Sequence, residues 1–97
     1  MLTGKQRAYL KGLAMDIEPT VYIGKAELTD NIIKEINDYL TAHELVKVKL
    51  QENVESDPKE TANIVARKLG AEYVQAIGRK FVLYRESTKN KKIFLPK

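Results

Sequence analysis

The spacing of apolar residues along the chain predicts three helices and four short strands. Apolar residues recur at intervals of three and four within residues 3–17, 29–40 and 57–69, which is the period of a helix with one buried face. Each of these segments begins with a residue that caps helices, namely Thr3, Thr29 or Asp57. Four segments rich in β-branched and aromatic side chains predict strands; they are residues 20–23, 45–50, 73–77 and 81–85.

Alternation within the second predicted strand indicates that its two faces differ. Val46, Val48 and Leu50 point to one side of the strand, and Lys47 and Lys49 point to the other. We therefore expect one buried face and one face that is at least partly in contact with water. Four aromatic side chains in the predicted strands could stack on nucleic-acid bases; they are Tyr22, Tyr73, Phe81 and Tyr84. Aromatic side chains in the strands of a small protein more often belong to the core, and we expect this of all four.

The predicted order of elements, α-β-α-β-α-β-β, defines the fold class. Two strand–helix–strand units require parallel strand pairs, and the short connection 78–80 predicts an antiparallel hairpin. We expect an α/β or α+β fold, a single domain over residues 1–97 with helices packed on a mixed four-stranded sheet. Residues 86–97 form a basic tail, and we expect its segment Ile93-Phe94-Leu95 to dock back on the domain.

Length and composition narrow the classes of function. With 97 residues, of which 43% are hydrophobic and 31% charged, the chain suits one globular domain whose small core leaves little room for an enclosed active site. No apolar run approaches the ~20 residues of a membrane span, and the first residues do not resemble a signal peptide. The absence of cysteine excludes disulfides and thiol chemistry and agrees with a reducing compartment. We therefore expect a cytoplasmic monomer without membrane contact.

Positive charge is concentrated at the two ends of the chain. Residues 1–11 contain three basic residues and no acidic one, and residues 78–97 contain seven basic residues against one acidic residue. The intervening residues 12–77 contain seven basic and twelve acidic residues, so the net charge of +4 comes from the ends. Clustered Lys and Arg displace counterions from phosphates, which favours a nucleic-acid partner. A basic tail that only keeps the protein in solution is the alternative.

The most informative local motif is the loop Gly24-Lys25-Ala26-Glu27, which precedes the second predicted helix. A loop of this kind presents backbone N–H groups and the positive end of a helix dipole to a phosphate. Lys25 adds a mobile cation at the same place. A plain connector between a strand and a helix is the alternative interpretation.

Motifs spread along the whole chain resemble those of the CRM domain. They are Gly24-Lys25-Ala26-Glu27-Leu28-Thr29, His43-Glu44-Leu45-Val46-Lys47-Val48, Val74-Gln75-Ala76-Ile77-Gly78 and Val82-Leu83-Tyr84-Arg85. The opening Leu2-Thr3-Gly4-Lys5-Gln6 and the closing Leu95-Pro96 resemble the stand-alone bacterial members, the YhbY-like proteins. The resemblance implies an RNA-binding domain shaped like the C-terminal domain of translation initiation factor three. It also implies a role on ribosomal RNA, in precursors of the large ribosomal subunit.

At one position the loop departs from the family pattern, which is G-x-x-G as in KH domains. Glu27 stands where the second glycine belongs. Glycine would allow a positive φ and a close approach of the backbone to phosphate, whereas glutamate disfavours both and adds a negative charge. We therefore expect a weaker phosphate contact at this loop, with Lys25 and nearby basic residues contributing more.

The residues expected to contact RNA come from three parts of the sequence. The resemblance implies that the first helix and the last strand flank the loop, which would bring Lys5, Lys11 and Arg85 near Lys25. The hairpin adds Arg79 and Lys80, because arginine grips phosphate with two parallel N–H groups. A turn whose basic side chains are only solvated is the alternative. The full predicted set is Lys5, Arg7, Lys11, Gly24, Lys25, Ala26, Glu27, Arg79, Lys80 and Arg85.

The sequence offers little for catalysis. His43 is the only histidine, and its position after a helix is typical of a side chain that interacts with the helix C-terminus. We find no metal-ligand spacing, P-loop or dinucleotide motif, and we therefore expect no metal, cofactor, small-molecule substrate or enzymatic activity. A small basic ribonuclease that uses Lys, Arg, Glu and Tyr, and a protein–protein adaptor, are the alternatives.

Overall fold

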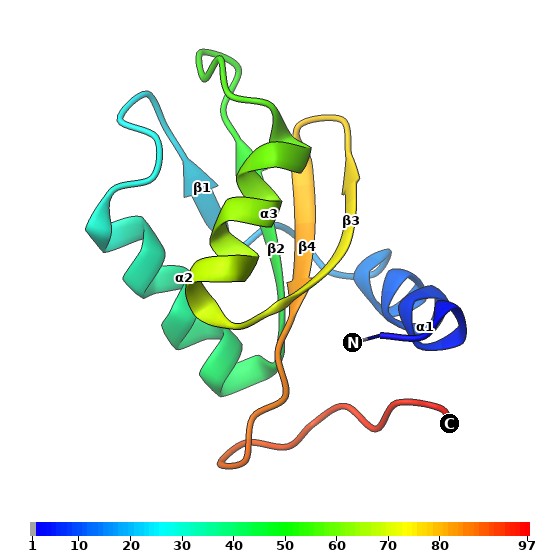
Figure 1. The fold of residues 1–97 in the computed structure, drawn as a ribbon. Helices are drawn as coiled ribbons and strands as arrows, with labels where there is room; N and C mark the ends of the chain where they lie inside the picture. Colours follow the sequence, from blue (N-terminus) through cyan, green and yellow to red (C-terminus); the bar gives the residue numbers. More distant parts are fainter. Residues whose placement is uncertain (1) are drawn as a thin grey trace.

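The structure, a computed structural model, describes residues 2–97 and contains the elements in the predicted order (Figure 1). The helices are α1 (Gly4–Ala14), α2 (Asp30–His43) and α3 (Pro58–Leu69), and the strands are β1 (Val21–Ile23), β2 (Leu45–Leu50), β3 (Glu72–Ile77) and β4 (Lys80–Tyr84). The predicted caps are confirmed, because Thr3, Thr29 and Asp57 each accept a hydrogen bond from the third N–H of their helix, over 3.1–3.2 Å. None of the helices within residues 2–97 is long and apolar enough to cross a membrane.

Helix α1 ends at Ala14, before the last apolar position predicted for it. The ammonium of Lys47 stabilises this end by donating hydrogen bonds to the carbonyl oxygens of Ala14 (3.0 Å) and Ile17 (3.1 Å). Carbonyls at a helix end have no partner within the helix, so a cation from the sheet is well placed to bind them. The chain then reaches β1 along the sheet, where the Thr20 N–H donates to the Lys47 carbonyl oxygen (3.0 Å).

The four strands form one mixed sheet in the order β1-β2-β4-β3. β1 and β2 are parallel, whereas β4 is antiparallel to both β2 and β3. The expectation of a second parallel pair is wrong, because β2 and β3 run in the same direction but β4 lies between them. Burial explains this order. Residues 81–84 of β4 are buried and occupy the centre, while β3 ends with the exposed Ile77 and forms an edge.

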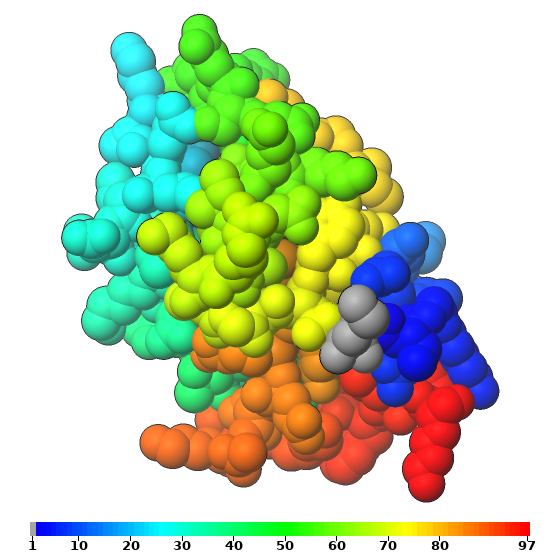
Figure 2. Space-filling model, viewed as in Figure 1, coloured from blue at the N-terminus to red at the C-terminus, as the bar shows by residue number. Residues whose placement is uncertain are grey.

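Helices cover the two faces of the sheet unequally. α2 and α3 lie together on one face, which Figure 1 and the space-filling view in Figure 2 both show from the helix side. Beneath them lies the larger apolar core, which includes the predicted buried face of β2. On the other face, a smaller core joins Leu10 and Ala14 of α1 to Val82 and Tyr84 of β4. We call this second side the α1 face of the sheet.

The C-terminal tail packs on the domain, as predicted. Ile93 and Leu95 contact the smaller core, whereas Phe94 between them is 73% exposed. The Gln6 side chain donates a hydrogen bond to the Pro96 carbonyl oxygen (3.0 Å), and Figure 2 shows the red tail beside the blue α1. The tail therefore completes the apolar cluster on the α1 face.

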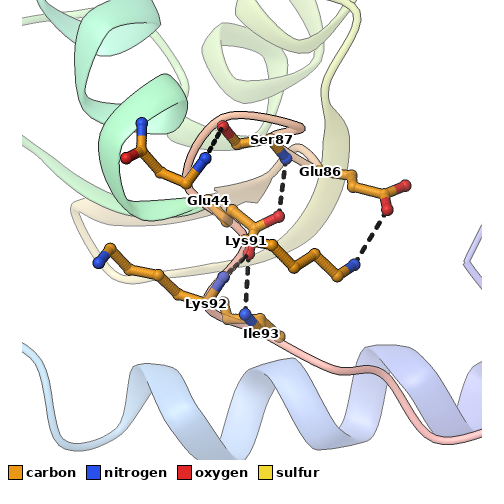
Figure 3. A network of polar contacts seen from close by, with 7 residues as sticks. Glu44, Glu86, Ser87, Lys91, Lys92 and Ile93 are labelled. Atoms are coloured by element: carbon orange, nitrogen blue, oxygen red, sulfur yellow. Dashed lines mark hydrogen bonds and ion pairs between the residues drawn. The ribbon is translucent and has the colours of Figure 1, made fainter.

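Glu44 anchors this tail (Figure 3). Its side chain is fully buried after the end of α2, and the carboxylate accepts hydrogen bonds from the backbone N–H groups of Ser87 (2.7 Å), Lys92 (2.7 Å) and Ile93 (2.8 Å). Burial raises the pKa of the Glu44 carboxyl, but the three donors and the Lys91 charge outweigh it, so the pKa lies below its ordinary value of 4.5. The carboxylate is therefore charged at neutral pH and holds the loop from Ser87 to Ile93.

Candidate nucleic-acid interface

Three connections meet at one end of the sheet, which we call the loop end (Figure 1). They are the β1–α2 loop with residues 24–27, the β2–α3 loop and the β3–β4 hairpin. Backbone hydrogen bonds join them. The Gln51 N–H donates to the Ile23 carbonyl oxygen (2.9 Å), and the Leu50 N–H donates to the Arg79 carbonyl oxygen (2.7 Å). The predicted phosphate loop and the predicted hairpin therefore lie at the same end of the sheet.

The β1–α2 loop has the backbone of a glycine loop although it carries Glu27. Glu27 has a φ of 61°, and its N–H donates to the Gly24 carbonyl oxygen (2.8 Å). Glutamate thus adopts the left-handed conformation that we expected it to disfavour, at a cost of roughly 1–2 kcal/mol. Lys25 and Ala26 are exposed, and within residues 2–97 no protein acceptor takes their backbone N–H groups. The loop can therefore offer these groups and the Lys25 ammonium to an anion.

The carboxylate of Glu27 is bound within the protein. It accepts a hydrogen bond from the Ser56 hydroxyl, which belongs to the β2–α3 loop. The same loop contributes further acidic side chains, namely Glu52, Glu55 and Asp57. Negative charge therefore gathers at the β2–α3 loop itself.

Arg79 at the hairpin is engaged in holding two loops together. Its Nη2 donates to the carbonyl oxygens of Gln51 (2.8 Å) and Val54. Its Nε is buried and has no protein acceptor in the described part of the chain. Because a two-pronged grip on phosphate would compete with these bonds, the geometry favours an orienting role for Arg79. Lys80, the next residue, carries the available cation of the hairpin.

Arg85 lies at the end of the sheet opposite Lys25, so the predicted proximity of these two residues is wrong. Because β4 runs antiparallel to β2, its last residue Tyr84 pairs with Leu45 at the start of β2, far from the loop end. The Arg85 guanidinium joins the ends of α2 and α3 to β4. Its hydrogen bonds of 2.8–3.1 Å go to the Asn37 side-chain and carbonyl oxygens, the Leu69 carbonyl oxygen and the Thr41 hydroxyl.

The basic residues of α1 lie beside β3, at the edge of the sheet opposite β1. Arg7 donates from Nε to the Tyr73 carbonyl oxygen (3.4 Å), and Arg7 and Lys11 line a hollow of about 420 Å³ with residues 73–77. Lys5 is exposed on the same helix. The expectation that Lys5 and Lys11 approach the β1–α2 loop is therefore wrong.

A larger hollow, of about 470 Å³, lies on the α1 face of the sheet next to the hairpin. It combines apolar and charged side chains, since Met15, Ile77 and Val82 line it together with Lys47, Lys49 and Lys80 and with one acidic residue, Glu52. Met15 is 80% exposed and Ile77 is 67% exposed. Sequence reasoning did not single out this place, because its residues come from six separate elements and connections.

Strand register places four residues of this region in one row across the sheet. Tyr22 pairs with Lys49, Lys49 pairs with Lys80, and Lys80 pairs with Ile77. Their sequence neighbours Val21, Val48 and Phe81 belong to the core under α2 and α3, so the row itself faces the α1 side. We call these four residues the sheet-face row. Within residues 2–97, neither Lys49 nor Lys80 forms an ion pair.

Tyr22 is the aromatic residue that the sequence misplaced. It was expected in the core, but it is 49% exposed, because the short strand β1 turns Val21 and Ile23 inward and Tyr22 outward. The expectation is confirmed for Phe81 and Tyr84, which are buried. The period of two in a strand was the signal that could have identified Tyr22, because Val21 and Ile23 cannot both face the core unless Tyr22 between them faces outward.

His43, the single histidine of the sequence, lies at the end of a helix. His43 is the last residue of α2, as predicted, and its ring centroid lies 4.3 Å from that of Tyr39. Across residues 2–97, no group of three or more His, Cys, Asp or Glu side chains is arranged to hold a metal ion.

Comparison with known proteins places the chain in a family. The model of the CRS1/YhbY (CRM) domain matches residues 2–85. The probable RNA-binding protein YqeI of Bacillus subtilis is 42% identical over 96 residues, which cover 99% of this chain and all of YqeI. An RNA-binding protein of Haemophilus influenzae is 40% identical, covering 99% of this chain and 96% of its own length.

A solved structure agrees with this. The solution structure of a candidate RNA-binding protein from Staphylococcus aureus has a TM-score of 0.83 and 47% sequence identity, covering 99% of this chain and all of the other. The family match, the full-length relatives and the shared fold together show that this chain belongs to the CRS1/YhbY (CRM) domain family.

Proposed function

We propose that this protein binds RNA, that its target is ribosomal RNA in precursors of the large ribosomal subunit, and that it acts as a cytoplasmic monomer without catalytic activity. Its family membership and the names of its relatives support RNA as the partner. The proposal of a ribosomal target rests on the resemblance of its motifs to the stand-alone bacterial members.

A connected series of cations on the α1 face is the observation that carries the proposal. The two hollows share Gln75 and Ile77, so the surface continues from α1 across β3 to β4 and β2. We call the cations along it the basic strip; they are Arg7, Lys11, Lys80 and Lys49. A strip of this kind suits a run of phosphates, and Lys25 adds a cation at the loop end.

The salt dependence of RNA affinity tests this proposal. We expect the affinity for a fluorescent ribosomal RNA fragment, measured by anisotropy, to fall steeply with added salt, because each phosphate contact releases about 0.7–0.9 counterions. Lys25→Ala and Lys80→Ala should each weaken binding by about 1–3 kcal/mol. Lys59→Ala is the matched control, since Lys59 is exposed on α3 beside acidic residues, and it should change little. Affinity that is flat between low and moderate salt would contradict the proposal.

The alternatives give different results in the same samples. A ribonuclease would shorten the RNA during incubation, whereas we expect the RNA to be recovered intact on a denaturing gel. A protein–protein adaptor would bind the RNA fragment weakly and without regard to the lysine substitutions.

A further inference from the structure

We propose that the sheet-face row and the adjoining hollow form a subsite for an unpaired nucleotide, whose base lies on Ile77 and Met15 and whose phosphate lies between Lys49 and Lys80. The inference rests on the proposed RNA binding and deepens it by naming the part of the RNA that this surface accepts. The subsite also gives a role to the exposed apolar residues of the hollow, which phosphate contacts do not explain.

The two lysines provide the argument for a bound anion. Lys49 and Lys80 are directly paired neighbours on adjacent strands and face the same side of the sheet. Like charges at paired positions repel and destabilise the strand pair, because their Cβ atoms lie only about 4.5–5.5 Å apart. The row itself contains no acidic residue, since its other members are Tyr22 and Ile77. Glu52 also lines the hollow, but within residues 2–97 it forms no ion pair with either lysine. A phosphate placed between the two ammonium groups would convert the repulsion into attraction.

The third lysine of the hollow has a different role. The Lys47 ammonium is already occupied by the carbonyl oxygens of Ala14 and Ile17. Its bonds hold the end of α1 over the middle of β2, so that Met15 stands at the border of the hollow. Lys49 and Lys80 are therefore the cations of this hollow whose ammonium groups are available to a ligand.

The apolar part of the surface suits a base rather than a second phosphate. Met15 and Ile77 are among the most exposed large apolar side chains of residues 2–97, and both line the same hollow. Exposed apolar surface that is gathered in one concave place marks a binding site more often than scattered exposure does. The volume of about 470 Å³ is ample for one nucleobase.

The shape of the surface favours unpaired over paired RNA. A base within a duplex is stacked between its neighbours and cannot lie flat on a sheet, whereas unpaired bases are splayed out and stack on side chains. Tyr22 offers a second stacking position at the other end of the row, about 14 Å from Ile77 across three strand spacings. Four-stranded sheets of this width bind two or three bases in RNA-recognition motifs.

Two pairs of variants test the subsite, each with a matched control on the other face or on the tail. Lys49→Gln with Lys80→Gln removes the phosphate contact, and Lys59→Gln with Lys68→Gln on α3 changes the net charge equally. Met15→Gln with Ile77→Gln removes the apolar contact, and Ile64→Gln with Phe94→Gln removes exposed apolar groups elsewhere. Anisotropy is measured with a single-stranded oligonucleotide and with a blunt duplex that contains it.

We expect the Lys49/Lys80 pair to weaken single-strand binding at least about 10-fold, and the Met15/Ile77 pair to weaken it about 5-fold or more. The Met15/Ile77 pair should leave duplex binding unchanged, and both control pairs should have little effect. Equal losses of single-strand and duplex binding in the Met15/Ile77 pair, or equal losses in test and control pairs, would overturn the subsite while RNA binding stands. No binding of either RNA by the unaltered protein would instead refute the proposed function. If circular dichroism shows that the protein with Met15→Gln and Ile77→Gln is unfolded, the single variant Met15→Gln replaces it in the binding measurements. Met15 is 80% exposed, so this substitution does not alter the core.

Discussion

Replacing Glu44 with glutamine tests how the C-terminal tail is held. Glutamine has the same length and meets the same φ of 69°, so the substitution isolates the negative charge. Its one carbonyl oxygen can still accept from Lys92 and Ile93, which share one carboxylate oxygen of Glu44. Its NH₂ group must then face the Ser87 N–H, which places donor against donor.

The expected loss follows from these three bonds. A hydrogen bond to a charged group contributes about 1.5–3 kcal/mol, and the two remaining bonds become weaker neutral ones. We therefore expect the free energy of unfolding to fall by about 2–4 kcal/mol, a large part of the roughly 5–15 kcal/mol that stabilises a typical domain. The loss of stability has an upper limit, because the tail can detach from the domain. Its N–H groups would then form hydrogen bonds with water.

Urea unfolding at neutral pH, followed by circular dichroism, measures the loss. Glu35→Gln is the matched control, since Glu35 is exposed on α2, and it should change stability by no more than about 0.5 kcal/mol. Hydrogen exchange should accelerate at the amides of Ser87, Lys92 and Ile93 in the Glu44 variant, while the amides of β2 stay protected. A Glu44→Gln protein as stable as the control, with those three amides still protected, would refute the reasoning.

Three further predictions use the same assays. Folding lowers the pKa of Glu44, so its contribution to the free energy of unfolding is fully present above pH 4.5 and is lost as the pH falls through the lowered pKa. The unaltered protein should therefore lose stability on acidification more steeply than Glu44→Gln does. Parallel curves of stability against pH would contradict this. Arg85→Ala should lower the free energy of unfolding by about 2–4 kcal/mol, because it removes the contacts between α2, α3 and β4, yet the folded variant should bind RNA normally; a clear affinity loss would place RNA at that end. Glu27→Gly relieves the left-handed φ but removes the hydrogen bond from Ser56, so it should change stability by no more than about 1 kcal/mol, and it should tighten RNA binding; weaker binding would give Glu27 a positive role.

The features that could be predicted from the sequence are those that depend on interactions between residues close together in the chain. The helix starts are set by Thr3, Thr29 and Asp57, whose partners lie three residues away, and the structure has these bonds. The order of strands is decided between distant segments, and the sequence pattern did not show that β4 separates β2 from β3. That insertion depends on burying both faces of β4 at once, which is a property of the whole sheet.

The candidate site divides in the same way. The loop from Gly24 to Glu27 was found because its chemistry is contiguous in the sequence. Arg79 was assigned to RNA from the chemistry of its side chain and Arg85 from the family resemblance, but both arginines bind carbonyl oxygens that distant segments supply. The pairing of Lys49 with Lys80 required the strand register, which no local pattern contains.

Crosslinking in living cells tests the central claim most directly. The tagged protein is crosslinked to RNA by ultraviolet light, purified under denaturing conditions, and the attached RNA is sequenced. We predict that the reads concentrate in the RNA of the large ribosomal subunit, including its unprocessed precursor, and that Lys49→Gln with Lys80→Gln reduces them strongly. Reads spread over cellular RNAs in proportion to their abundance, or the absence of crosslinked RNA, would contradict the account.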